Sequence, residues 1–371
     1  MNNVIKSENI AGERVYKERN SNIELYRIIT MLLIVAHHYV VTSGLTAVGG
    51  PVYADALSSK SIYLLLYGAW GKIGINCFVL ITGYFMCKSN ITLKKFMKLF
   101  LEIMFYKIVI SAIFLITGYQ SFSIVDFARD IIPFRNIAQN FTGCYVVFFL
   151  TIPFLNILVN NLTEKQHLKL LALVGFIYVF FGTVPGFSVR MNYVSWYIVL
   201  YFIGSYIRLY PKEIFNQTKL WGWLTLVFVG LSALSVVACA WLGTIIERNT
   251  AYYFVTDSNT FLAVATGVCS FMFFKNLKIK NSKFINTVAA STFGVLLIHS
   301  NSDTMRNWLW IDILKNVEMY DNGMVYIHSV LSVVGIFAIC IIIDIIRIRI
   351  IEKPLFRLYD KYFDVKLKKG C

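Results

Sequence analysis

Charged residues are scarce in this sequence. Only 15% of its 371 residues are charged and 57% are hydrophobic, whereas soluble domains carry about 25% charged residues. A soluble chain of this length would form two domains of ordinary size. The shortage of charge excludes that organisation and predicts an integral membrane protein.

Several familiar motifs are also missing. The chain has no Walker loop, no dinucleotide-binding glycine pattern and no zinc-ligand spacing. Its seven cysteines show no paired spacing, so we expect neither a disulfide framework nor a metal site. Residues 1–20 are polar and mixed in charge, without an apolar core or cleavage site. They predict a cytosolic tail rather than a signal peptide.

Long apolar segments are abundant. They lack the two-residue alternation of a β-barrel, and a spanning helix needs about 20 residues. We therefore expect an all-α integral membrane protein, a polytopic bundle of about ten transmembrane helices. The predicted spans are 23–41, 61–86, 96–118, 143–160, 168–185, 195–209, 220–242, 258–274, 285–300 and 325–346.

The formal net charge of +15 has a topological explanation. Placed loop by loop, most lysines and arginines fall on the side of the N-terminus, which is the positive-inside pattern. We expect both termini in the cytoplasm, a multi-pass plasma-membrane location and contact with membrane lipid. No soluble face gathers the charge, so we expect no nucleic-acid partner.

The chain divides into a tail (1–22), a membrane domain (23–350) and a basic tail (351–371). Loops 42–60, 119–142 and 301–324 are candidates to cover a site.

Ionisable residues inside the spans point to function. Arg27 and His38 lie on one face of the first predicted helix, about 16 Å apart. Lys72 and Lys107 also lie within spans. Burying an ionisable group in a membrane is costly, so Arg27 and His38 are functional candidates by default. One helix thus carries a fixed cation near its cytoplasmic end and a proton acceptor toward its outer end.

The other histidines differ in position. His299 ends the ninth span at a depth similar to that of His38, and either ring can accept a proton from a hydroxyl. Packing alone explains a lone membrane histidine equally well, so the role of His299 stays open. His37 points about 100° away from His38 and is interpreted as structural. His167 is expected to be solvated in a cytoplasmic turn.

Lys95 and Lys98 stand one helical turn apart and lead into the third span. Such a pair suits phosphate, although positive-inside flanking explains it without any function. Arg27 lies at the same membrane level. Together the three cations would form an anion site open to the cytosol.

Read in order, several segments resemble acyltransferase family 3, a family of integral-membrane proteins that are largely bacterial O-acetyltransferases of surface glycans. The likeness runs from Glu24 to about Arg357. It is carried by Glu24-Leu-Tyr-Arg27 with His38, Gly74-Ile-Asn-Cys-Phe-Val-Leu-Ile-Thr-Gly83-Tyr84, Lys95-x-x-Lys98, Trp196-Tyr-Ile-Val-Leu-Tyr201-Phe-Ile-Gly204, Phe293-Gly-Val-Leu-Leu-Ile-His299 and Glu352-Lys-Pro354.

Some positions depart from the family pattern. Glu24 stands where Asp is usual, Asn76 replaces an acidic residue, and Lys95 and Lys98 replace arginines. The tryptophan expected shortly before Tyr145 is absent. Lysine weakens a bidentate grip on phosphate, whereas none of these departures touches His38.

The resemblance implies transfer of an acetyl group from acetyl-CoA to a hydroxyl of a cell-surface or lipid-linked glycan, without a metal. Glu24, Arg27 and His38 would be catalytic, and Arg27, Lys95 and Lys98 would hold the CoA phosphates. His38 would act as general base or would itself carry the acyl group. The residues expected to bind the acceptor are His299, Tyr145, Asn301 and Trp196.

Other functions stay open at this point. A proton-coupled transporter or flippase also uses intramembrane Arg and His, although the sequence shows no inverted repeat. A membrane scaffold would leave Arg27 and His38 unexplained. The donor can also be another acyl-CoA such as succinyl-CoA, and a homo-oligomer is compatible with the sequence.

Overall fold

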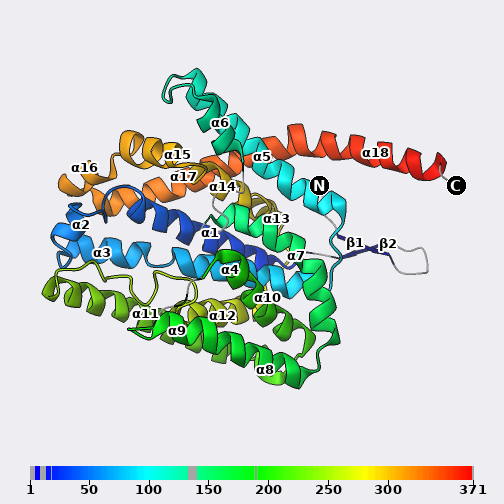
Figure 1. The fold of residues 1–371 in the computed structure, drawn as a ribbon, viewed down its shortest axis with the longest axis horizontal. Helices are drawn as coiled ribbons and strands as arrows, with labels where there is room; N and C mark the ends of the chain where they lie inside the picture. The colour runs from blue at the N-terminus through cyan, green and yellow to red at the C-terminus, as the bar shows by residue number, and fades with distance from the viewer. Residues whose placement is uncertain are drawn as a thin grey trace.

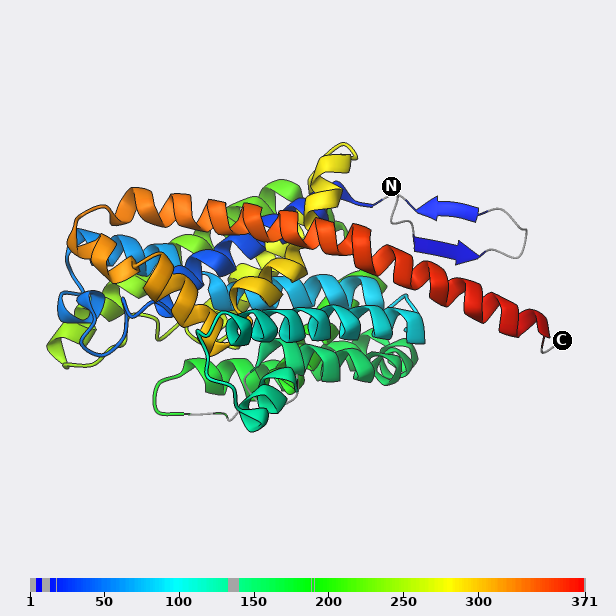
Figure 2. The same cartoon turned by 90° about the horizontal axis from the view of Figure 1, so that it is seen from above.

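The computed structural model describes residues 5–8, 14–17, 19–132, 140–187, 189 and 191–369. Within these residues the chain is almost entirely helical. The exception is an antiparallel pair of short strands that the sequence did not predict, β1 (Ile5–Glu8) and β2 (Arg14–Lys17). This pair and the C-terminal helix α18 (Lys353–Lys369) lie at one end of the bundle (Figures 1 and 2).

Among the described residues, seven helical segments are long and apolar enough to cross a membrane, which confirms a helical multi-pass architecture. They are α1 (Ser21–Val41), α3 (Ser59–Gly68) with α4 (Gly71–Met86), α5 (Leu93–Ile116), α7 (Phe141–Asn161), α8 (Glu164–Val174) with η1 (Gly175–Phe180) and α9 (Phe181–Thr183), α11 (Thr218–Ile245), and α17 (Val325–Arg347) with η4 (Ile348–Glu352) and the first part of α18.

The other three predicted spans are also helical but shorter. They form α10 (Tyr193–Leu209), α12 (Phe261–Asn276), and α13 (Lys283–Ala290) followed by α14 (Thr292–His299). The total of ten crossings and the side on which the termini lie stay predictions. The remaining elements are α2 (Pro51–Ala54), α6 (Ile124–Ile131), η2 (Glu213–Asn216), α15 (Asp303–Asn307), η3 (Trp308–Ile313) and α16 (Asn316–Asp321).

Helix α1 lies at the centre of the bundle. It packs against α3, α4, α12, α13, α14 and α17. Small residues let neighbouring helices approach closely: a Cβ at Gly83 would stand 2.9 Å from Tyr201 Cα, and a Cβ at Gly204 would stand 2.7 Å from Leu80 O. Small residues at helix interfaces are typical of membrane bundles, and here they bring α4 and α10 into backbone contact.

A buried ionic cluster ties α5 to α17. Arg347 lies 3.0 Å from Glu102, 2.8 Å from Asp344 and 3.0 Å from Glu352. The Tyr106 hydroxyl donates to Asp344 over 2.8 Å. All four ionic side chains are at most 10% exposed. A buried arginine with three carboxylate partners fixes the relative position of two helices, because removing a partner leaves a buried charge unpaired.

One histidine prediction is wrong. His167, expected to be solvated, is fully buried in α8. Its Nε2 lies 3.0 Å from the Phe202 carbonyl, and its ring packs edge-on against Tyr206 and Tyr210. Its neighbours in the chain are polar, but α10 packs against α8 and covers this face. The His167 ring thus supports helix packing.

Candidate functional site

The two histidines expected at similar depth meet in the structure. His38 Nδ1 on α1 lies 2.9 Å from His299 Nε2 at the end of α14. The ring centroids are 5.1 Å apart. His299 is fully buried, whereas His38 is half-buried. Only the packing of α1 against α14 brings together two residues that are 261 positions apart.

The hydrogen bonds around this pair fix which nitrogen carries each proton. His299 Nδ1 lies 2.6 Å from the Val295 carbonyl, which can only accept, so His299 Nδ1 carries a hydrogen. In a neutral ring His299 Nε2 is then an acceptor, and His38 Nδ1 donates to it. The remaining nitrogen of His38, Nε2, keeps its lone pair. The pair therefore orients His38 as a proton acceptor.

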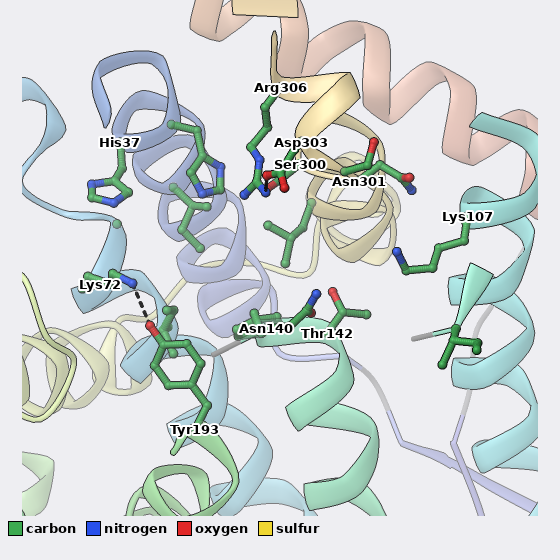
Figure 3. Close-up of a pocket in the computed structure, with 18 residues that line it drawn as sticks. His37, Lys72, Lys107, Asn140, Thr142, Tyr193, Ser300, Asn301, Asp303 and Arg306 are labelled. Atoms are coloured by element: carbon green, nitrogen blue, oxygen red, sulfur yellow. Dashed lines mark hydrogen bonds and ion pairs between the residues drawn. The ribbon is translucent and has the colours of Figure 1, made fainter. Parts of the chain in front are cut away.

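A cavity of about 350 Å³ adjoins His38. Side chains from α1, α4, α5, α7, α10 and the segment after α14 surround it, and Figure 3 shows the labelled ones around one space. Its polar and charged lining consists of His37, His38, Lys72, Lys107, Asn140, Thr142, Tyr193, Ser300, Asn301, Ser302, Asp303 and Arg306. A cavity of this size lies in the range of small-ligand sites.

Two of the three predicted covering loops line this cavity. Segment 301–324 supplies Asn301, Asp303 and Arg306, and segment 119–142 supplies Asn140 and Thr142. Residues 133–139 of the latter lie outside the described part of the chain. Loop 42–60 contributes instead to a separate cavity with α11.

His37 belongs to the same wall but has a structural partner. Its Nδ1 donates to the Gly68 carbonyl over 2.6 Å. A Cβ at Gly71 would stand 2.2 Å from the His37 ring, so only glycine lets α4 begin so close to α1. This contact sets the position of Lys72, the next residue, in the cavity wall.

Arg27 and Glu24 lie near the opposite end of α1, 3.7 Å apart. Glu24 also lies 3.7 Å from Arg19. Burial lowers the pKa of Arg19, and the nearby Glu24 carboxylate offsets part of that decrease. Among the described residues, the buried Arg27 Nε atom has no hydrogen-bond partner.

The other two predicted phosphate ligands already have protein partners. Lys95 Nζ donates to Ser89 Oγ and Asn90 O, each over 2.7 Å. Lys98 Nζ lies 2.7 Å from Glu352, at the edge of the ionic cluster. A phosphate at Lys98 would share that lysine with a carboxylate. Within the described part of the chain, Arg27, Lys95 and Lys98 share no common partner.

The predicted acceptor residues are placed at different depths. Asn301 lines the cavity, and its Nδ2 donates to the Leu297 carbonyl, which leaves Oδ1 as an acceptor. Tyr145 stands behind Phe141, which lines the cavity, with the two rings stacked at 5.8 Å. Trp196 is fully buried and donates to Asn76 over 2.9 Å. His299 likewise lies behind His38, so the structure brings only Asn301 of these four to the cavity lining.

Sequence reasoning did not assign a role to Lys72, Lys107, Tyr193 or Arg306. The first two carried a usable signal, because both are ionisable residues inside predicted spans. Lys72 donates to the Tyr193 hydroxyl over 2.7 Å (Figure 3). Tyr193 and Arg306 carried no signal of their own, since nothing local distinguishes them from interfacial residues.

Comparison with known proteins matches the chain to a protein family. A search of the curated proteins found no match, and neither did a search of the solved structures. A family model described as "Acyltransferase domain" (Acyl_transf_3) matches residues 20–345, which include His38, His299 and the described lining of the cavity. The chain therefore belongs to acyltransferase family 3.

Proposed function

We propose that this protein is a membrane O-acetyltransferase that moves an acetyl group from cytosolic acetyl-CoA to a hydroxyl of a cell-surface or lipid-linked glycan. One observation carries the proposal. In a chain of acyltransferase family 3, His38 lines a polar cavity and is oriented by His299 so that its Nε2 can accept a proton.

The reaction needs one well-placed base. His38 Nε2 would take the proton of the acceptor hydroxyl as its oxygen bonds to the thioester carbonyl carbon. The carbon–sulfur bond then breaks, and the departing CoA thiolate takes the proton from His38. The products are an O-acetyl ester and CoA. His299 would hold the His38 ring throughout, because its Nε2 accepts from the nitrogen that does not react.

The same nitrogen could instead attack the thioester and carry the acetyl group before the acceptor arrives. The two routes differ in a detectable intermediate. Mass spectrometry of protein quenched without acceptor would find an acetyl group on His38 only in the second route.

The two ends of α1 suit the two substrates. Arg27 Nε, which has no hydrogen-bond partner in the described part of the chain, lies at the end of α1 that we expect to face the cytosol, where the CoA phosphates would lie. The cavity lies among helix ends assigned to the outer side by the charge pattern: the ends of α1 and α14 and the starts of α7 and α10. Asn301 Oδ1 would accept a hydrogen bond from a sugar hydroxyl there. An acetyl group could thus cross the membrane while CoA stays in the cytosol.

Complementation tests the proposal in cells. A strain lacking the gene would receive wild type, His38→Ala or the control His328→Ala, each verified at equal membrane level. His328 bonds to Tyr39 and does not line the cavity. We expect wild type and the control to restore O-acetyl signals in the NMR spectrum of surface glycans, and His38→Ala to leave them absent. Restoration by His38→Ala would remove His38 from the mechanism.

Purified protein separates acyl transfer from transport. An acyltransferase releases CoA from acetyl-, propionyl- or succinyl-CoA when acceptor is added, and the preferred acyl group gives the highest rate. Movement of a glycan across a vesicle membrane without CoA release would instead favour the flippase alternative.

A further inference from the structure

The cavity beside His38 is rich in positive charge. Lys72 from α4, Lys107 from α5 and Arg306 from α15 line it, and Asp303 is the one carboxylate in its described lining (Figure 3). Lys72 and Lys107 lie inside apolar helices that are long enough to cross a membrane. Placing two lysines there is unfavourable unless they have a task.

Arg306 and Lys72 differ in whether the described protein supplies a carboxylate partner. Arg306 pairs with Asp303, whose side chain is 90% exposed. Among the described residues, Lys72 has no carboxylate partner: its Nζ donates to the Tyr193 hydroxyl over 2.7 Å and lies 5.4 Å from the centre of that ring. Because the tyrosine oxygen accepts from Lys72, its own hydrogen stays available for another acceptor. Lys72 and Tyr193 together therefore offer N–H and O–H donors to an anion.

These cations are close to the reacting centre. Lys72, Lys107 and Arg306 line the same cavity of about 350 Å³ as His38. One small ligand in this cavity would thus place an anionic group at Lys72 and a hydroxyl at His38. Charge-assisted hydrogen bonds of this kind are about twice as strong as neutral ones.

We infer that the acceptor is an anionic glycan. The sugar that presents its hydroxyl to His38 carries, or adjoins, a carboxylate or phosphate that Lys72 holds together with Tyr193, in the cavity that Arg306 also lines. The inference rests on the proposed function and narrows its substrate class. The acceptor is favoured over the CoA phosphates because the cavity lies at the opposite end of α1 from Arg27.

Matched acceptors test the inference with the purified full-length protein in lipid nanodiscs. We would compare a neutral oligosaccharide, the same oligosaccharide with one residue oxidised to a uronic acid, and the same chain carrying a phosphodiester. We expect kcat/KM to be at least about tenfold higher for one anionic acceptor than for the neutral one, since a hydrogen bond to a charged group contributes about that factor. The better of the two shows whether carboxylate or phosphate is the natural group.

Variants at Lys72 identify the residue responsible. Lys72→Met should lower the anionic-to-neutral ratio of kcat/KM about tenfold, through KM for the acceptor, while Lys72→Arg should keep most of the ratio. Lys60→Gln is the matched control: this lysine lies in an expected outer segment, bonds to the Tyr320 carbonyl and does not line the cavity. Its acceptor preference should equal that of wild type.

Three results would overturn the inference while leaving acyl transfer intact. Wild type could use neutral and anionic acceptors equally well. Lys72→Met could raise KM for acetyl-CoA with every acceptor, which would assign the cations to the donor. The variant could also lower kcat equally with all acceptors, which would assign Lys72 to the oxyanion of the transition state.

Direct binding gives a second measurement. Without acetyl-CoA, the anionic oligosaccharide should bind the wild type more tightly than the neutral one does, and Lys72→Met should abolish the difference. If no acceptor were acylated but this preference were seen, the proposed function would fail and the anionic ligand would stand. If neither were seen, both would fail.

Discussion

The hydrogen bond between the two histidines predicts that activity tolerates glutamine at position 299 better than leucine. Because His299 Nε2 accepts from His38 Nδ1 over 2.9 Å, any replacement that offers an acceptor at that point should preserve the orientation of His38. Glutamine places an amide oxygen near the position of Nε2. Leucine fills a similar space and offers no acceptor.

The expected loss follows from the burial of this bond. His299 is fully buried, so His299→Leu leaves the Nδ1–H group of His38 without a partner, which costs about 1–3 kcal/mol. If that cost falls on the transition state, kcat decreases about 5- to 150-fold. His299→Gln should stay within about fivefold of wild type on the same reasoning.

The assay is the initial rate of acceptor-dependent CoA release by purified protein, with the ester product identified by mass spectrometry. Nitrogen NMR of labelled histidine would report directly whether His38 carries its proton on Nδ1 in the wild type and in His299→Gln. His328→Gln serves as a control, because His328 lies outside the cavity lining. The reasoning is refuted if His299→Leu is as active as wild type, or if glutamine is as damaging as leucine.

Three further predictions concern the scaffold. Arg347→Met should destabilise the protein by about 3–5 kcal/mol, seen as a lower thermal midpoint in detergent, because three buried carboxylates lose their shared cation; an unchanged midpoint would contradict the role of the cluster. Gly294→Ala should destabilise by about 1–3 kcal/mol in the same assay, since its Cβ would stand 2.4 Å from Asp344 Cγ, whereas Gly335→Ala, whose Cβ meets open space, should be nearly neutral. In a cysteine-free background, Val48→Cys should react with a membrane-impermeant maleimide on intact cells, and Lys280→Cys should react only after permeabilisation. Both positions are exposed, and the charge pattern assigns them to opposite sides of the membrane. The reverse labelling pattern would show that the topology is inverted.

Much of the helical architecture could be predicted from the sequence because hydrophobic length is a strong local signal. Each predicted span coincides with one helix or with two or three consecutive ones, and the exceptions concern short polar pieces such as β1 and β2. Local signals also include single costly residues. Arg27 and His38 could be singled out because a charge or an imidazole in an apolar run is conspicuous anywhere in a chain. Lys72 and Lys107 carried the same signal without being assigned a role.

The arrangement of the site could not be predicted, because it depends on contacts between distant segments. No local pattern indicates that His299 meets His38, or that the Val295 carbonyl determines where the protons lie. Local pattern was misleading at His167, because its polar neighbours suggested exposure although α10 covers it. Lys98 shows the same limit, because its partner Glu352 lies 254 positions away on the segment that follows α17.

The most direct test of the account follows labelled acetyl groups from acetyl-CoA to a glycan, using purified protein in lipid nanodiscs. Wild type should form the O-acetyl ester and release one CoA per ester formed, and His38→Gln, which cannot accept a proton at that position, should reduce the rate at least about 100-fold. An equal rate with His38→Gln would contradict the role of His38. Failure of the wild type to form the ester with any acceptor would contradict acyl transfer itself.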